Sequence, residues 1–354
     1  LVSLLIDAPC CCDWSWIIME LKKENPDKYY NLNEEIGRGK YAVVKNCSDN
    51  KTRKQLVAKL IKYEADTEKN TKQEFEIMAT LKHDKLLSAR DGFIVQKYVV
   101  IVMDRVEGKE VLEFLAEKTI ASEEDASLVI AQLVDALTYL HKKNIVHLDI
   151  RPANLLVSRD FKLTLIDYGN ARRIQSPDGQ FVDAVGVTEF TAPEVLNFEM
   201  THWGADMWSV GVLLYILLSA TLPFTIEDSD DQNADDKVAA KVKSVSYEMP
   251  VSLFRNATQE AENLIKKLLI RQPERRPTAS SCLDDPWLSP ILTQKRKSSE
   301  IPASKFKFLN DQLKEAEEDE LIVASCVLRS FDEEAYESPE EEEEEEEEKE
   351  KEEE

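Results

Sequence analysis

The sequence lacks any arrangement of cysteine and histidine that would hold a structural metal. It has 6 cysteines and 4 histidines, and no cysteine pair separated by two residues comes with matching histidines. Three of the cysteines, Cys10, Cys11 and Cys12, are adjacent in the chain, and adjacent cysteines are poor disulfide partners. We therefore expect no zinc site, reduced thiols and a cytoplasmic protein.

Long hydrophobic runs are also missing. The apolar start of the chain has no basic beginning and contains Asp7, Pro9 and Asp13, so it does not fit a secretory signal peptide. A second apolar run, residues 210–218, is too short to span a bilayer and predicts a helix buried in a large helical lobe. We expect no membrane segment. The chain begins without Met, which suits a fragment of something longer.

Clustered positive charge, which a nucleic-acid-binding protein would need, is absent, and the formal net charge is -24. Most of this charge lies at the end of the chain, where residues 332–354 contain 17 acidic residues and 2 lysines. Such a block repels itself and cannot bury apolar surface, so we expect it to be disordered. It serves either as a solvated linker or as an arm for basic partners, and we expect no nucleic-acid ligand.

Glycine is scarce, with 9 residues in 354, so the places where it occurs are informative. Gly37 and Gly39 lie close together before a β-rich run that contains Val44. This pattern is typical of a hairpin that covers nucleotide phosphates, with Val44 packed on the adenine. Two glycines alone would also suit any tight turn, and Ala42 stands where a third loop glycine is usual.

Residues 57–60 form a short β-rich run that contains one lysine, Lys59. A strand lysine at this distance from the glycine loop can aim its ammonium at phosphate groups, although it can equally face solvent. An acidic ion-pair partner for Lys59 would distinguish the first case from the second. Glu74, in the predicted helix that follows, is the expected ion-pair partner of Lys59, and Glu76 is the less favoured alternative.

The most informative stretch is residues 147–154, which read His-Leu-Asp-Ile-Arg-Pro-Ala-Asn and precede Asp167-Tyr168-Gly169. An Asp and an Asn at this spacing also occur in ordinary turns. Together with the Asp-Tyr-Gly run they match the spacing that phosphoryl transfer requires. Asp149 would accept the proton of a substrate hydroxyl, and Asn154 and Asp167 would hold Mg2+.

Downstream, residues 186–194 end in Ala-Pro-Glu, an apolar helix begins near Asp206, and Arg276 is the predicted buried partner of Glu194. With these motifs in this order, residues 30–290 resemble the eukaryotic protein kinase superfamily. The closest likeness is to the kinases of the obscurin and striated-muscle preferentially expressed branch of the calmodulin-dependent group, with titin-like and Trio-like kinases next. The resemblance implies ATP and Mg2+ as cofactors and protein hydroxyls as substrates.

The resemblance implies an α+β fold with two lobes: a small antiparallel β lobe with one main helix, and a large, mainly helical lobe. We expect strands over residues 31–36, 42–46, 55–61, 93–95 and 98–103. A capping box at Ser122 should begin a long helix that leads into residues 147–154. The expected boundaries are a linker over residues 1–28, a kinase domain over 29–290 (small lobe 29–103, hinge 104–110, large lobe 111–290), a regulatory tail over 291–331 and the acidic tail over 332–354.

The same resemblance assigns the nucleotide site residue by residue. Met103 is the expected gatekeeper, backbone groups at Asp104 and Val106 should bind adenine, and Glu110 should bind the ribose. The full set expected to contact the nucleotide is Ile36, Gly37, Gly39, Val44, Ala58, Lys59, Met103, Asp104, Val106, Glu110, Asn154, Leu156 and Asp167. Asp149, Arg151, Lys59 and Glu74 are the expected catalytic residues.

Besides Ala42, four residues depart from the family pattern. Leu148 replaces an arginine that captures a phosphorylated activation segment, so we expect activity without that phosphorylation. Arg151 replaces the catalytic-loop lysine and keeps its charge in a bulkier, forked group, which can slow turnover. Tyr168 replaces a phenylalanine, and Ala153 removes a carboxylate that many kinases use toward basic substrates. Two hypotheses remain: a working serine/threonine kinase, and a pseudokinase scaffold that acts by binding partners.

The segment after the large lobe suggests regulation. Basic residues 295–297 precede a stretch in which Phe306, Leu309 and Leu313 share one helical face. This face can pack on the large lobe as an intramolecular inhibitor or a simple cap, or it can bind a calmodulin-like regulator. The resemblance also implies association with the sarcomere or cytoskeleton.

Overall fold

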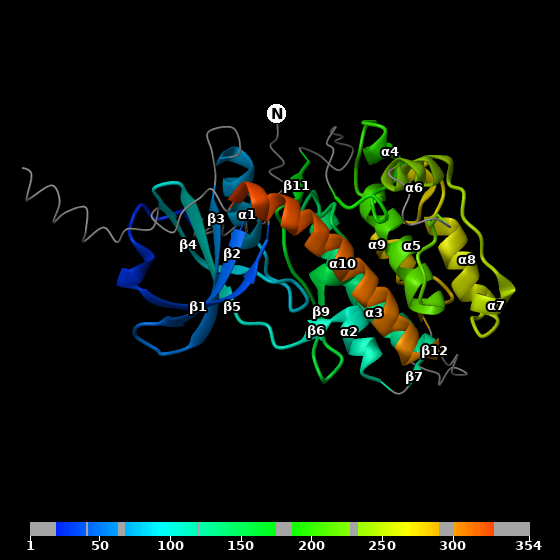
Figure 1. Ribbon diagram of the computed structural model, residues 1–354, viewed down its shortest axis with the longest axis horizontal. Helices are drawn as coiled ribbons and strands as arrows, with labels where there is room; N and C mark the ends of the chain where they lie inside the picture. The colour runs from blue at the N-terminus through cyan, green and yellow to red at the C-terminus, as the bar shows by residue number, and fades with distance from the viewer. Residues whose placement is uncertain are drawn as a thin grey trace, which may run out of the picture.

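The computed structural model describes residues 19–39, 42–62, 68–118, 120–174, 186–226, 233–289 and 301–328. These residues form two lobes, a small lobe built on a β-sheet and a larger helical lobe (Figure 1). The predicted α+β kinase architecture is confirmed. The predicted disordered tail over residues 332–354, the basic residues 295–297 and the adjacent cysteines 10–12 lie outside the described residues.

The small lobe contains a five-stranded antiparallel sheet in the order β1-β2-β3-β5-β4. β5 is an interior strand, between β3 and β4, and is almost wholly buried, as expected for a run of Val and Ile between two packed faces. All five predicted strands are present, with the bounds β1(Tyr30–Arg38), β2(Ala42–Asp49), β3(Gln55–Lys62), β4(Ala89–Val95) and β5(Tyr98–Asp104).

The two faces of this sheet belong to different hydrophobic clusters. One face packs on α1(Glu68–Ala79), whose buried side chains Phe75, Ile77 and Met78 join the main core of the molecule. The other face forms a separate outer cluster, made of Tyr30, Cys47, Leu56, Ala58, Leu60, Phe93, Val100 and Val102. Because side chains alternate along a strand, neighbouring residues of β3 and β4 face different clusters.

A short segment before β1 adds to the outer edge of the sheet. The backbone of Lys22 donates to Gly92 O (3.0 Å) and accepts from Ile94 N (2.9 Å), so Lys22 pairs with β4. The turn η1(Pro26–Lys28) then leads into β1. The part of the predicted linker that is described, residues 19–28, therefore lies against the small lobe.

The large lobe is organised around two long helices, α3(Glu123–Lys142) and α5(Gly204–Ser219). The predicted capping box begins α3: Asp125 N donates to Ser122 Oγ (3.1 Å) and Ser122 N to Asp125 Oδ2 (2.9 Å). Every residue of α5 is buried, which explains the apolar run over residues 210–218. The remaining helices are α2(Val111–Ala116), α4(Pro193–Leu196), α6(Ala234–Ser244), α7(Val251–Phe254), α8(Gln259–Leu268), α9(Ala279–Cys282), η2(Pro152–Asn154) and η3(Pro273–Arg275).

Short strand pairs hold the loops of the large lobe in place. β9(Leu155–Val157) pairs with β10(Leu163–Leu165) and β6(Lys109–Glu110), and β8(Ile145–Val146) pairs with β11(Arg172–Arg173). These pairs fix both ends of residues 147–154 and the start of the Asp167 loop. The sheet network therefore places the two predicted metal ligands on neighbouring, well-anchored segments.

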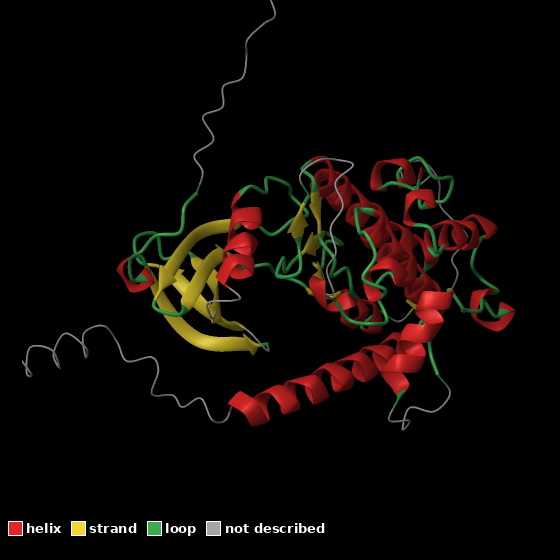
Figure 2. Cartoon of the chain, turned by 90° about the horizontal axis from the view of Figure 1, so that it is seen from above, coloured by secondary structure: helices red, strands yellow, loops and turns green. Residues whose placement is uncertain are grey.

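The chain ends its described part in a helix that returns across the molecule. β12(Ile301–Pro302) pairs with β7(Ile120–Ala121), and α10(Ala303–Leu328) then packs on α2 and runs from the large lobe toward the small lobe (Figures 1 and 2). Phe306 and Leu309 are buried and Leu313 is partly buried, so the predicted apolar face is confirmed. Within the described segments, no helix is both long enough and apolar enough to cross a membrane.

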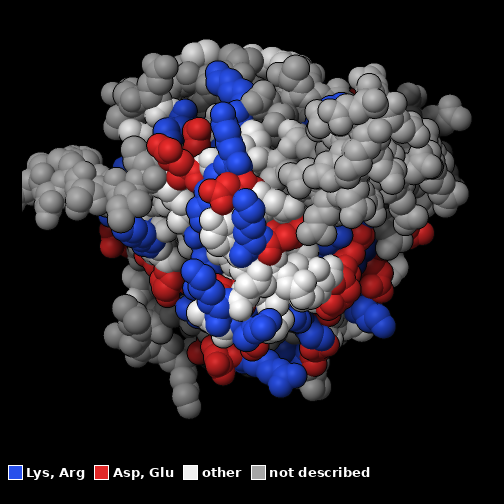
Figure 3. All heavy atoms as spheres, turned by 90° about the vertical axis from the view of Figure 1, so that its left-hand side faces the viewer, with Lys and Arg blue, Asp and Glu red and all other residues white. Residues whose placement is uncertain are grey.

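Charges of both signs are mixed on the end of the small lobe, where basic side chains lie beside acidic ones (Figure 3). Two ion pairs of this lobe illustrate the mixing: Lys54 Nζ lies 2.6 Å from Asp104 Oδ1, and Lys22 Nζ lies 2.6 Å from Asp91 Oδ2. The exposed pair of Lys54 with Asp104 contributes little to stability.

Candidate active site

A cavity of about 320 Å3 lies between the lobes and gathers most of the predicted nucleotide residues. Its lining comes from β1, β2, β3, α1, the hinge after β5, β9 and the Asp167 loop. Among the predicted residues, it includes Ile36, Val44, Lys59, Glu74, Met103, Asp104, Val106, Leu156 and Asp167. Apolar side chains beside the charged cluster of Lys59, Glu74 and Asp167 suit a nucleotide, whose base is flat and whose phosphates are anionic.

One predicted nucleotide contact is wrong. Ala58 does not line the cavity; it lies in the outer cluster on the opposite face of β3. The residue that lines the cavity is Val57, because alternation along the strand puts Val57 and Lys59 on the same face. Counting by twos from Lys59 would have found Val57 in the sequence.

The glycine loop is the hairpin between β1 and β2. Gly37 pairs with Val44 across the hairpin, and Gly39 N donates to Ala42 O (2.8 Å). Neither glycine is among the residues that line the cavity, and the loop tip, residues 40–41, lies outside the described part. Val44, predicted to contact adenine, does line it.

Lys59 lies at the centre of an ion-pair network. Its Nζ is 2.8 Å from Glu74 Oε1 and 2.9 Å from Asp167 Oδ1. The favoured partner, Glu74, therefore forms the ion pair, whereas the alternative, Glu76, is exposed to solvent. Burial disfavours the charge on Lys59, but the two carboxylates outweigh it and raise the pKa of Lys59. Burial likewise opposes ionisation of Asp167, yet the charge of Lys59 holds the pKa of Asp167 at about 2.

We expect this network to show in the acid dependence of stability. The pKa of Asp167 is lowered from 3.8 to about 2, so its ionisation stabilises the folded chain above the unfolded-state value and this contribution disappears as pH falls through about 2. The unfolding free energy of the parent minus that of Asp167→Asn should therefore be constant above about pH 5 and shrink below about pH 4. Urea unfolding at a series of pH values measures it. A difference that stays constant down to the lowest pH would contradict the expectation.

The predicted catalytic loop brings three of its residues together. Asn154 Nδ2 donates to Asp149 Oδ2 (2.9 Å) and to Asp149 O (2.9 Å). Arg151 Nε lies 3.2 Å from Asp149 Oδ1, so the forked side chain that replaces the usual lysine is held beside the predicted base. The Asp149 side chain is 13% exposed, which leaves it reachable by a substrate hydroxyl.

The residues predicted to bind Mg2+ offer oxygen atoms, the ligands this ion prefers. Asn154 uses its amide nitrogen for both bonds to Asp149, so its amide oxygen can coordinate a cation. Asp167 Oδ1 accepts from Lys59 and from Gly169 N (3.1 Å). Among the described residues, no group of three or more His, Cys, Asp or Glu side chains is arranged for a metal. Two protein ligands are what a site completed by nucleotide phosphates and water requires.

A buried contact between two tilted aromatic rings lies next to the loop. The rings of His147 and Tyr168 lie 5.2 Å apart, and the Tyr168 hydroxyl, which needed a partner, donates to Leu165 O (3.2 Å). Burial lowers the pKa of His147, so its imidazole is neutral. Leu148 is buried in the main core with a left-handed backbone (φ 64°), and its N–H donates to Asp206 Oδ1 (2.8 Å).

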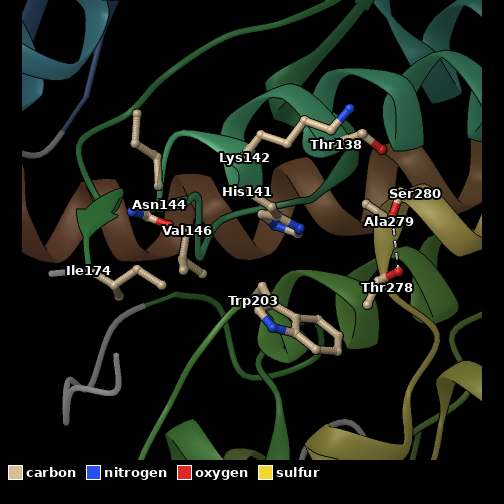
Figure 4. Close-up of a pocket in the computed structure, with 11 residues that line it drawn as sticks. Thr138, His141, Lys142, Asn144, Val146, Ile174, Trp203, Thr278, Ala279 and Ser280 are labelled. Atoms are coloured by element: carbon tan, nitrogen blue, oxygen red, sulfur yellow. Dashed lines mark hydrogen bonds between the residues drawn. The ribbon is translucent and has the colours of Figure 1, made fainter. Parts of the chain in front are cut away.

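Asp206 connects the catalytic loop to a second hollow on the large lobe. It accepts the backbone N–H of His147 (3.0 Å) and lies 2.8 Å from His141 Nε2. His141 in turn lines a cavity of about 250 Å3, together with Trp203, Ser280 and eight other residues (Figure 4). Sequence reasoning did not single out His141, because its role depends on contact with a residue 65 positions away.

The predicted buried ion pair between Glu194 and Arg276 is present. Arg276 Nη1 donates to Glu194 Oε1 (2.6 Å) and Nη2 to Glu194 Oε2 (2.8 Å), and both side chains are essentially inaccessible. This bidentate ion pair links the short helix α4 to the segment before α9. It anchors the end of the activation segment, of which residues 175–185 lie outside the described part.

Glu110, the predicted ribose ligand, is not among the residues that line the cleft. It lies at the end of β6 with its Oε2 3.5 Å from Lys314 Nζ of α10, which also lies 3.6 Å from Glu113 Oε2. The tail helix therefore contacts the carboxylate that was predicted to bind the ribose. This contact was not predicted from the sequence, since it joins residues about 200 positions apart.

Comparisons with known proteins agree with this geometry. The protein kinase domain family matches residues 30–288. Mouse death-associated protein kinase 2 is 33% identical over 301 residues, which are 81% of this chain and 79% of that protein. The striated muscle preferentially expressed protein kinase of Danio rerio is 34% identical over 269 residues, 76% of this chain but only 9% of that much longer protein.

The fold is also found in a solved structure described as the autoinhibited serine kinase domain of the giant muscle protein titin. The TM-score is 0.71 at 26% identity, covering 80% of this chain and 87% of that one. The predicted resemblance to muscle kinases of the calmodulin-dependent group is thereby confirmed. The chain belongs to the protein kinase domain family.

Proposed function

We propose that the chain is a serine/threonine protein kinase that transfers the γ-phosphate of ATP to protein hydroxyls. The observation that carries the proposal is the network around Lys59, in which one ammonium contacts both Glu74 (2.8 Å) and Asp167 (2.9 Å) inside the interlobe cavity. This is the arrangement that positions nucleotide phosphates in kinases. Serine/threonine kinases among the relatives support the same activity.

In this proposal each residue of the site has a distinct task. Asp149 accepts the substrate proton, Lys59 orients the phosphates and Glu74 orients Lys59. Arg151 stabilises charge on the transferred phosphoryl group. Asn154 and Asp167 would hold a Mg2+ ion, which would supply positive charge to neutralise the phosphates. Backbone groups of the hinge bind the adenine, and the side chains of Val44, Val57 and Leu156, which line the cavity, enclose it.

The pseudokinase alternative is the less favoured one. A scaffold without catalysis would be free to lose any of the charged residues, yet Lys59, Glu74, Asp149, Asn154 and Asp167 are all present. The direct test is transfer of labelled γ-phosphate from Mg-ATP to a generic protein substrate by the full chain, beside the Asp149→Asn variant. Signal that requires Asp149 supports the kinase, and equal background from two folded proteins would favour the scaffold.

We further propose that the tail helix restrains the site. α10 packs on α2, and its Lys314 lies 3.5 Å from Glu110, the residue predicted to bind the ribose. A helix in this place competes with the nucleotide for Glu110 and must shift for full ATP binding. The relative described as autoinhibited is consistent with such an arrangement. A calmodulin-like regulator that binds the apolar face of α10 would release the restraint.

Loosening α10 should therefore raise activity. Phe306→Asp places a charge at a fully buried position of the α10 interface and should lower the KM for ATP by roughly fivefold to tenfold, because a larger fraction of molecules can bind nucleotide. Phe308→Asp is the matched control, since Phe308 is on the same helix but 66% exposed. Steady-state kinetics at varied ATP measures both variants. Equal KM values for Phe306→Asp, Phe308→Asp and the parent would argue against restraint by the helix.

The setting proposed for this activity is cytoplasmic, in association with the sarcomere or cytoskeleton. The relatives named for striated muscle and for titin support this setting. Localisation of the tagged full-length protein in muscle cells would test it, and a diffuse signal with no sarcomeric or cytoskeletal pattern would count against it.

A further inference from the structure

Gly92 in β4 makes room for a single bulky side chain of α1, Phe75. A Cβ built on Gly92 would lie 2.2 Å from Phe75 Cε2 and 2.6 Å from both Cδ2 and Cζ. These distances are far inside van der Waals contact, so any side chain at position 92 would displace the ring. Phe75 is 1% exposed and is the residue that directly follows Glu74 in the helix.

The glycine is required for space and not for backbone conformation. Gly92 lies in regular antiparallel pairing with Ile101 of β5, and Gly186 is the one glycine of the described residues with a positive φ. Glycine within a strand weakens it and often marks a close approach of another element. Here the element that approaches is α1, which packs on β4 and β5.

The strand cannot easily yield to a larger side chain, because its outer side is braced by the N-terminal segment. Lys22 pairs with the backbone on both sides of Phe93. Asp91, which is buried, accepts from Lys22 Nζ (2.6 Å), from the Tyr30 hydroxyl (3.3 Å) and, through Oδ1, from Gly92 N (2.9 Å). A clash at position 92 would therefore move the helix in preference to the strand.

Movement of the helix would directly displace Glu74, which contacts Lys59 in the candidate active site. Glu74 Oε1 is 2.8 Å from Lys59 Nζ, a distance at which a shift of about 1 Å breaks the hydrogen bond. We infer that Gly92 and Phe75 form a positioning pair: the absent side chain at 92 lets α1 approach β4 closely enough for Glu74 to hold Lys59. The inference rests on the roles proposed above for Lys59 and Glu74.

The test exchanges size between the two positions in the full chain. Gly92→Val should lower kcat by roughly tenfold to a hundredfold, the effect expected of a displacement of about 1 Å in a catalytic group, with a smaller change in the KM for ATP. Phe75→Val removes the three colliding ring atoms. Combined with Gly92→Val, it should restore kcat to within about threefold of the parent, because the two valines together replace most of the lost ring.

A control separates positioning from simple loss of stability. Val100→Ala truncates a buried residue of the outer cluster, on the face of the sheet that α1 does not touch. It should lower the unfolding midpoint while leaving kcat of the folded enzyme within about twofold of the parent. A Gly92→Val enzyme that is folded and has parental kcat would overturn the inference, as would a folded double variant with no recovery.

Hydrogen exchange gives a readout that does not depend on activity. Amides of residues 68–79 should exchange faster in Gly92→Val, and return to the parental rate in the double variant, because the packing of α1 is lost and then restored. If the parent itself transfers no phosphate, the proposed function fails but the exchange experiment still decides whether the pair positions α1. Unchanged exchange in Gly92→Val would sink the inference.

Discussion

Asp149→Asn is expected to reduce kcat for phosphate transfer by roughly 10²- to 10⁴-fold, the range that a positioned general base contributes. The substituted amide cannot accept the proton of the substrate hydroxyl. The fold should survive, because the amide oxygen can still accept from Asn154 Nδ2, which now lies 2.9 Å from Asp149 Oδ2. The KM for ATP should change little, since Asp149 is not among the residues that line the nucleotide cavity.

Single-turnover transfer of labelled phosphate measures this effect, with the unfolding midpoint as a check on folding. Asp160→Asn is the matched control, because Asp160 is an exposed turn residue of the same lobe and should keep parental kcat. An Asp149→Asn enzyme that retains more than about a third of the parental rate would show that Asp149 is not the base.

Arg276→Met should cost about 3–5 kcal/mol of unfolding free energy, the usual cost of leaving one partner of a buried ion pair without the other. Arg276 is fully buried, and besides Glu194 it donates to Gly204 O (2.8 Å) and Ile270 O (3.0 Å). Its guanidinium also lies 5.1 Å from the ring centre of Trp208. Methionine fills a similar volume but leaves the Glu194 carboxylate and both carbonyl groups without these donors.

The exposed ion pair of Arg271 with Glu199 provides the comparison. Its N–O distance is 2.6 Å, the same as in the buried pair, but Arg271 and Glu199 are 36% and 48% exposed. Arg271→Met should therefore cost at most about 1 kcal/mol. Urea unfolding of the two variants gives both values. Similar losses of unfolding free energy in the two variants would mean that burial does not determine how much the Arg276 ion pair stabilises the fold.

The two ion pairs within the kinase core were predictable because each residue belongs to a motif with a defined place in the fold. Lys59 with Glu74, and Glu194 with Arg276, are separated by 15 and 82 positions, and both pairs formed as expected. The positions of the five strands and the capping box at Ser122 also agreed, since they depend on local alternation and local hydrogen bonds, although β4 begins four residues before its predicted start and β2 ends three residues after its predicted end. The prediction that Ala58 contacts the nucleotide was wrong because it did not take account of the two-residue period of the strand, which places Ala58 on the opposite face from Lys59.

Contacts between segments that carry no shared motif could not be predicted. No local pattern in the sequence of β4 or α1 predicts that the Phe75 ring packs against Gly92, because the contact depends on how closely the helix approaches the sheet. The contact of Lys314 with Glu110 likewise depends on the path of α10 across the lobe.

The motifs in the sequence were enough to predict, by resemblance, the kinase family and the two-lobed fold, and they underlie the roles proposed for Asp149, Asn154 and Asp167. They suffice because phosphate transfer constrains which residue types stand at which positions along the chain. The distance of α1 from β4, the position of the tail helix over α2 and the face on which Ala58 lies depended on three-dimensional packing. Packing sums many weak contacts between distant segments, and no single residue encodes that sum.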